Sequence, residues 1–318
     1  MENRLLELHL HLDGSLRPET VWELSKEQGI DLGVDSLEKV DFQMRVPADC
    51  KTLEEYLERF AMPLLVLQRE DAIERVTFEL VEDLAKAGLG YAEIRFAPQL
   101  STQQGLTQAQ VVEAAIRGAQ RGMAAYPSIR AGLLLCCMRG DTNEAANLET
   151  VEMVHQYLGD VVCGVDIAGA EGLFPTEMFR TVFEKAKSYH LPTTIHAGEA
   201  AGPESVWTAL EFGATRIGHG VNAVQDPKLM EELARRGTTL EVCPTSNLHT
   251  KVMARLEDHP VRQLFDAGVH VSISSDNMTV SNTDIAQELD VLRKYLHFTE
   301  EEIDKTLQYG WDARFLKD

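Results

Sequence analysis

The chain has 318 residues, of which 44% are hydrophobic and 25% are charged, so its composition excludes a largely disordered or low-complexity protein. Thirty Lys and Arg against 51 Asp and Glu give a formal net charge of −21. A surface this acidic repels phosphate backbones, which argues against nucleic acid as a partner. The longest apolar runs, such as Gly132–Met138, are far shorter than the ~18 residues of a membrane span, so we expect no membrane partner.

The N-terminus and the cysteines favour a cytoplasmic protein. Residues 1–4 do not begin a basic region followed by an apolar stretch, so we expect no signal peptide. The five cysteines are odd in number and form no C-x-x-C pair. This argues against a disulfide framework and a thiolate zinc site, and we expect reduced, mostly buried thiols.

Short apolar runs alternate with amphipathic stretches along the whole chain. The runs predict eight strands, at Leu5–Leu12, Tyr91–Ala97, Ile129–Met138, Val161–Ala168, Thr193–Ala197, Arg216–Gly218, Thr239–Cys243 and His270–Ser274. The intervening stretches predict helices at Asp71–Gly88, Thr107–Tyr126, Asn143–Gly159, Thr176–His190, Glu204–Gly213, Pro227–Gly237, Pro260–Gly268 and from Thr283 onward. A last helix should begin at Thr299, because Thr299 and Glu302 fit a capping box.

Eight alternations of strand and helix favour an α/β fold, a parallel (β/α)8 TIM barrel, as a single domain over residues 1–318. A doubly wound sheet would place G-x-G-x-x-G after the first strand, where this chain has HLDGS at 11–15. Roughly eighty residues separate the first two strands, more than one crossover helix needs. We expect a helical insertion at Ser36–Leu67, as a layer packed on the barrel rather than as a lid over its mouth.

Chemistry in this fold occurs at the carboxyl ends of the strands, and the first strand ends in two histidines. His9 and His11 are two residues apart, so both imidazoles point into the barrel. Two histidines in an apolar interior are costly unless they bind something. A metal explains both, because imidazole is the most common nitrogen ligand, although a hydrogen-bonded core pair is the alternative.

Further polar groups follow three other strands. The fifth strand ends at His196 and Glu199, the sixth at His219, and the eighth at Asp276. Together with the first strand they supply imidazoles and a carboxylate that suit one zinc ion. A remaining Glu and His could move protons and orient a water molecule, which is the equipment of a metal-dependent hydrolase.

These segments resemble the adenosine deaminase family of the amidohydrolase superfamily over nearly the whole chain. The matching segments are HLHLDGS at 9–15, DIAGAE at 166–171, HAGE at 196–199, RIGHG at 216–220, CPTSN at 243–247 and SSDN at 274–277. The other type of zinc deaminase has H-x-E and P-C-x-x-C motifs, and this chain has no such pair of motifs.

The resemblance implies the residue roles. The expected ligands of one zinc ion are His9, His11, His196 and Asp276. Glu199 is expected to protonate purine N1, and His219 to orient or deprotonate the attacking water. Gly169 would donate its N–H to purine N3, Asp13 would hold a ribose hydroxyl, and His11 would also contact the substrate. Relatives with two metals have a Lys at the fourth strand, where this chain has none, so one zinc is expected.

The chain departs from the family at Asn277, where adenosine deaminases often have a second Asp. In the family this residue faces purine N7, an acceptor. An Asn amide donates there as it stands, so the contact with a purine is preserved. Relatives that act on adenine or aminofutalosine often have Glu at the position of Asp13, so Asp13 favours a nucleoside.

Other polar residues have less definite roles. Ser246 and Asn247 could support Asp276 or Asn277 from behind, and His249 could line the pocket. Cys243 is expected to pack rather than react. The histidines expected to be solvated in or beside helices are His155, His190, His259 and His297.

The expected reaction is zinc-dependent hydrolysis of adenosine, and of 2′-deoxyadenosine, to inosine or deoxyinosine and ammonia. The partners would then be a small purine nucleoside and water. Alternatives are a deaminase of adenine, aminodeoxyfutalosine, or a modified adenosine or AMP. Arg17 and Arg139 follow strands and could contact a phosphate, but neither decides the matter. A catalytically inactive barrel that only binds a metal or a nucleoside is the remaining alternative.

Overall fold

The computed structural model describes residues 5–159 and 161–317. The expectation that no signal peptide is present at residues 1–4 therefore falls outside the described residues. Within the described parts of the chain, no helix is long and apolar enough to cross a membrane.

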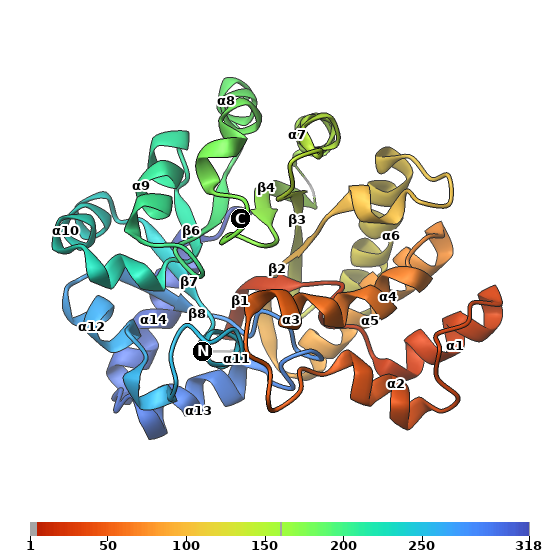
Figure 1. Cartoon of the computed structure of the whole chain (residues 1–318), viewed down its shortest axis with the longest axis horizontal. Helices are drawn as coiled ribbons and strands as arrows, with labels where there is room; N and C mark the ends of the chain where they lie inside the picture. The colour runs from red at the N-terminus through yellow and green to blue at the C-terminus, as the bar shows by residue number, and fades with distance from the viewer. Residues whose placement is uncertain (1–4, 160, 318) are drawn as a thin grey trace.

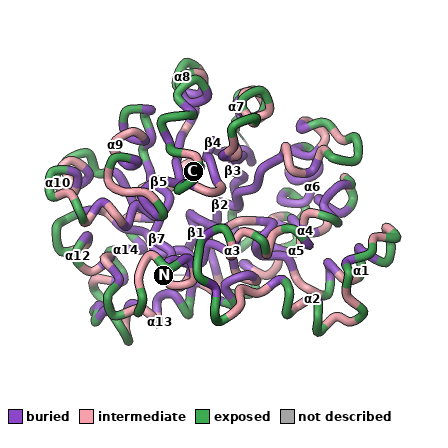
Figure 2. The backbone as a smooth tube through the Cα atoms, viewed as in Figure 1, coloured by how far each residue is buried: buried purple, intermediate pink, exposed green. Residues whose placement is uncertain are grey.

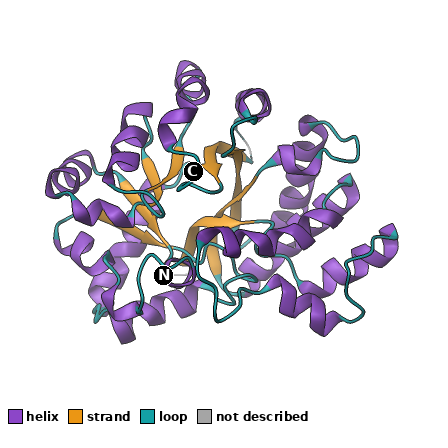
Figure 3. Cartoon of the chain, viewed as in Figure 1, coloured by secondary structure: helices purple, strands orange, loops and turns teal. Residues whose placement is uncertain are grey.

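Eight parallel strands form the centre of the molecule, with helices around them, as the TIM barrel prediction requires (Figures 1 and 3). The strands are β1 Leu5–His11, β2 Leu89–Phe96, β3 Arg130–Met138, β4 Val162–Ala168, β5 Thr194–Ala197, β6 Arg216–His219, β7 Thr239–Val242 and β8 His270–Ile273. Each strand pairs with its neighbour in chain order, in two four-stranded sheets, β1 to β4 and β5 to β8. Isolated parallel bridges Val165–Thr193 and Leu10–Asp276 join the two sheets and close the barrel.

The helices occupy nearly every position that the amphipathic stretches predict. They are α1 Pro18–Gln28, α2 Leu37–Met44, α3 Leu53–Leu57, η1 Glu58–Phe60, α4 Ala61–Val66, α5 Glu70–Lys86, η2 Pro98–Ser101, α6 Gln108–Ala125, α7 Glu144–Tyr157, η3 Thr176–Phe179, α8 Arg180–Ser188, α9 Pro203–Phe212, η4 Val221–Gln225, α10 Pro227–Arg236, α11 Pro244–His249, η5 Leu256–Asp258, α12 Val261–Asp266, α13 Ile285–Tyr295 and α14 Glu300–Ala313. The capping box of Thr299 and Glu302 is present at the start of α14. Helices α1 and α11 were not predicted.

The strands are buried along almost their full length, since helices cover the outside of the barrel (Figure 2). The five cysteines are buried and unpaired, as expected. The inside of the barrel also holds charged groups. Arg95 donates to Asp166 and Glu241, and Arg216 donates to Glu93 and Glu241. Each of these side chains is buried, so the charges are compensated within the barrel rather than by water.

The insertion between β1 and β2 does more than the expected packing. Tyr56 of α3 shares a hydrogen bond of 2.7 Å with Ser281, and the Val46 N–H donates to the carbonyl of Val280, so the insertion is anchored beside the carboxyl end of β8. The cavity at the barrel mouth is lined in part by residues of the insertion, namely Leu53, Tyr56, Leu57, Phe60 and Leu64. The prediction that the insertion only packs on the barrel was therefore incomplete. Its position beside the cavity depends on contacts with distant residues, which the sequence pattern does not show.

Candidate active site

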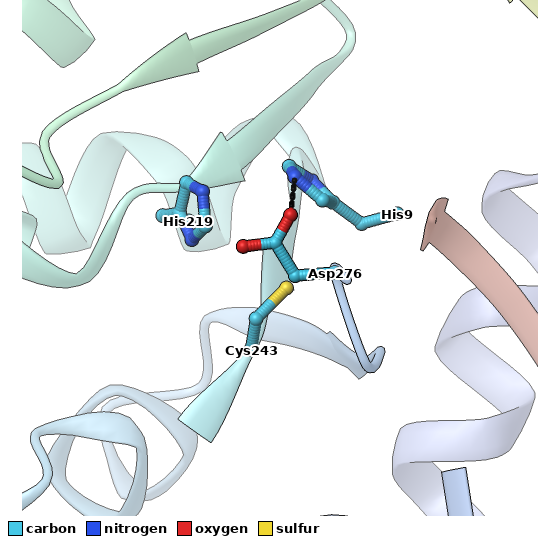
Figure 4. A group of neighbouring side chains, drawn as sticks. All are labelled: His9, His219, Cys243 and Asp276. Carbon is cyan, nitrogen blue, oxygen red and sulfur yellow. Dashed lines mark ion pairs between the residues drawn. The ribbon is translucent and has the colours of Figure 1, made fainter. Parts of the chain in front are cut away.

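The two histidines of β1 meet groups from β5 and from the end of β8. His11 Nε2 lies 3.2 Å from His196 Nε2 and 3.3 Å from Asp276 Oδ1. His9 Nε2 lies 3.5 Å from the same oxygen, and Figure 4 shows this pair with the neighbouring His219 and Cys243. Alternation along β1 directs both imidazoles inward, and barrel closure brings Asp276 to them, because the Asp276 N–H donates to the His9 carbonyl.

Buried carboxylates hold the outer nitrogens of two of these imidazoles. His9 Nδ1 lies 2.9 Å from Glu241 Oε2, and His196 Nδ1 lies 2.9 Å from Asp166 Oδ2. Arg95 holds both carboxylates in place. Metal-binding histidines commonly have such carboxylates on their second nitrogen, because the carboxylate fixes the tautomer and leaves Nε2 free to bind.

The residues fit a metal ion. His9 Nε2 is buried and has no hydrogen-bond partner. Ligand nitrogens of His9, His11 and His196 lie within 4.8 Å of one another, and Asp276 Oδ1 lies beside the first two. Burial lowers the pKa of His9 to about 4 and that of His11 well below its usual value, so both are neutral and can donate lone pairs. Nearby histidines hold the pKa of the Asp276 carboxyl well below its usual range against the cost of burial.

His9 and Asp276 also lie within metal-binding distance of His219 and Cys243. Burial raises the pKa of the Cys243 thiol well above its usual value, so it stays protonated, and it donates to the Glu241 carbonyl. His219 Nδ1 is engaged by Asn247. Because the Cys243 thiol stays protonated, the set with His11 and His196 is the better ligand set, and Cys243 packs, as expected.

The loop after β5 carries Glu199, and Glu171 holds that loop. The Glu171 carboxylate accepts hydrogen bonds from four successive backbone N–H groups, of residues 198–201, at 2.7 to 3.0 Å. The loop turns at Gly198, where φ is +73° and a Cβ would lie 2.5 Å from Val206. The backbone at Glu199 is therefore fixed by a single buried carboxylate.

The Glu199 side chain is fixed on one side only. Its Oε1 accepts hydrogen bonds from Asn247 at 3.0 Å and Thr250 at 2.9 Å. Its Oε2 lies 3.5 Å from His219 Nε2, and Glu199 and His219 both line the cavity. The oxygen Oε2 is the one left for chemistry.

Two unpartnered polar atoms belong to residues that line the same cavity. Asp13 Oδ1 and Asn277 Oδ1 are buried and have no hydrogen-bond partner. Burial raises the pKa of Asp13 to about 7. Gly14 makes room for Asn277, since a Cβ there would lie 1.8 Å from Asn277 Oδ1. Gly169 also lines the cavity, with φ of +111°. Buried polar atoms that are unpaired in a cavity are suited to bind a ligand.

His219 and Asp276 have left-handed backbone conformations, with φ of 60° and 63°. Residues other than glycine rarely adopt this conformation, and it is costly by about 1–3 kcal/mol. Both residues follow or end a barrel strand at the cavity. Both side chains line the cavity, and such conformations recur at functional sites.

The structure brings all the predicted site residues to this one end of the barrel, but it corrects some supporting roles. Ser246 donates to Asp276 Oδ2 at 2.6 Å, as predicted. Asn247 instead contacts Glu199 and His219. His259 is not solvated: it is 3% exposed and lies behind Asn247. Of the residues after β7, Thr250 rather than His249 is among the described lining of the cavity.

Sequence reasoning missed three charged groups that hold the site: Arg95, Glu171 and Glu241. Each lies in or just after a strand, and a charged residue at such a place was the signal in the sequence that could have identified it. Their partners lie on other strands and loops, so the contacts could not be read from spacing.

Comparison with known proteins agrees with this geometry. The family model described as adenosine deaminase matches residues 5–318. The chain belongs to the adenosine deaminase family. An adenosine deaminase of Haemophilus ducreyi is 46% identical over 98% of this chain and 92% of its own length.

Solved structures of the same fold carry more than one substrate name. An adenine deaminase of Arthrobacter aurescens has a TM-score of 0.91 and 25% identity, covering 99% of this chain and 95% of its own. An N6-mAMP deaminase of Arabidopsis has a TM-score of 0.85 and 26% identity, covering 98% of this chain and 93% of its own. The barrel alone therefore does not select a base, a nucleoside or a nucleotide.

Proposed function

We propose that the protein hydrolyses adenosine and 2′-deoxyadenosine to the corresponding inosine and ammonia. One observation carries the proposal: a metal-ligand cluster, a carboxyl group with one free oxygen and two unpaired polar atoms all meet at one cavity. The substrate class rests on the relatives named as adenosine deaminases.

Zinc is the metal we propose, because three neutral imidazoles and one carboxylate are a donor set that suits it. The proposed ligands are His9, His11, His196 and Asp276. When bound, zinc supplies Lewis-acid activation of water at neutral pH.

Glu199 supplies the proton for the purine ring. Its Oε1 is occupied by Asn247 and Thr250, so a proton on Oε2 is the one that can be given to purine N1. Protonation of N1 makes C6 electrophilic, and the water oxygen forms a bond to C6. One proton of that water moves to the exocyclic nitrogen, the bond from C6 to this nitrogen breaks, and the nitrogen leaves as ammonia. The carboxyl group then regains a proton from the water that was consumed.

The remaining cavity groups orient the substrate. The Asn277 amide would face purine N7, the Gly169 N–H would face N3, and Asp13 would accept from a ribose hydroxyl. All three residues line the cavity. Asp13 has a buried side-chain oxygen whose hydrogen bond is unmade until a ligand binds. The contact with N7 would use the amide nitrogen of Asn277, which donates, whereas the unpaired Asn277 Oδ1 can only accept.

A free nucleoside fits better than a nucleotide. Arg17 is paired with Glu82 and Asp83. Arg139 donates to the Phe174 and His196 carbonyls. The wall that the insertion contributes to the cavity consists mainly of leucine and aromatic side chains, and a phosphate would lose hydration against it.

A substrate panel tests the proposal: adenosine, 2′-deoxyadenosine, adenine, AMP and aminodeoxyfutalosine, each followed for ammonia release by the metal-loaded protein. We expect the two nucleosides to have the highest kcat/KM. A higher value for any other compound would replace the proposed substrate. Bound metal without turnover of any of them would indicate a binding protein instead.

A further inference from the structure

A row of hydrogen bonds runs from α12 to His219, and it begins at a backbone N–H group. The Val261 N–H donates to His259 Nδ1 at 3.1 Å. A backbone N–H can only donate, so Nδ1 of His259 carries a lone pair. Burial lowers the pKa of His259 to about 3, so the ring is neutral and its proton is on Nε2.

That proton fixes the orientation of the Asn247 side chain. His259 Nε2 lies 3.3 Å from Asn247 Oδ1, so the oxygen accepts there. The amide nitrogen then lies on the opposite side, 3.0 Å from Glu199 Oε1, where it donates to a carboxyl oxygen. The reversed amide would place two donors together at His259 and two acceptors together at Glu199. The orientation is thus determined from both ends.

The same amide nitrogen fixes His219. Asn247 Nδ2 lies 3.1 Å from His219 Nδ1, and it can only donate. His219 Nδ1 must therefore hold a lone pair, and the proton of the neutral ring is on Nε2. That nitrogen lies 3.5 Å from Glu199 Oε2, on the side of the cavity and the metal-ligand cluster.

We propose that His259 and Asn247 are positioning residues that hold His219 in the tautomer with its proton on Nε2, so that His219 acts as a hydrogen-bond donor. The inference rests on the proposed deamination for its functional meaning. A donor at this place can hold the oxygen of the attacking water, but it cannot take its proton. The acceptors left beside it are the carboxylates of Glu199 and Asp276. Of the two roles expected for His219, orienting the attacking water or deprotonating it, this tautomer allows only the first.

The direct test is the protonation of the ring nitrogens, read by NMR on the metal-loaded protein with histidines labelled with nitrogen-15. The His219 signals are assigned by their loss in His219→Ala. We expect a protonated Nε2 and an unprotonated Nδ1 for both His219 and His259. A protonated Nδ1 on His219 would overturn the proposal. This measurement needs no substrate, so it stays informative even if adenosine is not turned over and the proposed function fails.

Asn247→Asp is the informative variant, because it keeps the shape but replaces the donor by an acceptor. We expect the His219 proton to move to Nδ1 and kcat to fall by about ten- to a hundredfold, with KM changed less than about threefold. Gln43→Glu is the matched control: it adds the same charge on an exposed side chain of α2 and should leave kcat and the ring signals unchanged. Unchanged His219 signals in Asn247→Asp would refute the proposal.

His259 is tested by a pair of variants. His259→Gln keeps an N–H group that can reach Asn247, whereas His259→Leu removes it. We expect His259→Gln to keep kcat within about threefold and His259→Leu to lose about tenfold and show mixed protonation of His219. A loss caused only by poorer folding would reduce the active fraction and leave the His219 signals as in the parent, and that result would count against a positioning role.

Discussion

At the scale of single residues, His11 is the proposed metal ligand that a substitution tests most directly. It is partly exposed to the cavity, and its Nε2 lies among the other donors. We expect the purified protein to hold one zinc per chain and His11→Ala to lose most of it, as measured by elemental analysis. His155→Ala is the control. His155 is exposed on α7, stacks on Tyr189 and is not among the residues that line the cavity. Full zinc and activity in His11→Ala would remove it from the ligand set.

Glu199 should matter for the chemical step and not for the metal. Glu199→Gln keeps the hydrogen bonds of Oε1 but cannot cycle a proton at the other position. General acid–base groups contribute typically ~10²–10⁴ in rate, so kcat should fall by about that factor with zinc retained. Steady-state kinetics and elemental analysis on one preparation check both statements. A loss below tenfold would exclude Glu199 as the proton donor.

Asn277 should recognise purine N7. Loss of the partner for a buried donor costs ~1–3 kcal/mol, or roughly five- to two-hundredfold in kcat/KM. We expect that loss for 7-deazaadenosine, which has C–H in place of N7. We expect Asn277→Asp to stay active with a steeper pH dependence, since a carboxyl group must be protonated to donate. Equal kcat/KM for the two nucleosides would show that Asn277 does not contact N7.

The residues that bear chemistry could be predicted, and several of those that hold them could not. His9 and His11 are recognisable because two histidines at alternate positions of a buried strand need a ligand. His259 looks like an ordinary solvated histidine, because its burial depends on the packing of the loops after β6 and β7. Asn247 was predicted to support the site, but its partners follow from the direction of α11.

At the scale of elements, the loop after β5 depends on Glu171. In Glu171→Gln one oxygen that accepts backbone N–H groups becomes an amide nitrogen, which repels them. We expect kcat to fall by about tenfold or more, because charge-assisted hydrogen bonds are worth ~1.5–3 kcal/mol each. Faster hydrogen exchange of residues 198–201 would locate the cause. Glu231→Gln, which changes an exposed side chain of α10, should change neither quantity.

The strands were the most predictable elements. All eight apolar runs coincide with strands, because the inner strands of a parallel barrel are buried on both faces and therefore almost continuously apolar. Helix α1 was missed, and the insertion was placed correctly, but its contribution to the cavity wall was not predicted. Pro18 marks the start of α1, yet only the contacts of α1 to α4 show which surface each helix covers.

At the scale of the whole molecule, buried carboxyl groups should make stability depend on pH. Glu288 is fully buried on α13 and accepts from the Thr245 N–H and the Thr283 hydroxyl. Burial raises its pKa from 4.5 to about 7. Between these pH values the folded chain keeps a proton on Glu288 that the unfolded chain releases. The contribution of Glu288 to stability is therefore fully present below pH 4.5 and is lost as the pH rises through about 7.

Glu288→Gln should remove this loss, since the amide can still accept from Thr245 and can donate to Thr283. Relative to the parent, its free energy of unfolding should improve between pH 4.5 and about pH 7 by on the order of 1.4 kcal/mol per pH unit at most, and level off above that. Urea unfolding of the zinc-saturated proteins measures this. Glu301→Gln changes an exposed residue of α14 and should follow the parent. The same slope in Glu288→Gln and parent would contradict the shift.

The backbone hydrogen bonds that join β1 to Asp276, just after β8, have a consequence for biosynthesis. His9 and His11 leave the ribosome before Asp276, which pairs with both through backbone hydrogen bonds and follows the last strand of the barrel. A nascent chain therefore has histidines but no complete set of ligands until β8 is made. Metal loading would then mark finished chains, and a protein cut short before residue 276 should neither capture zinc tightly nor release ammonia from adenosine.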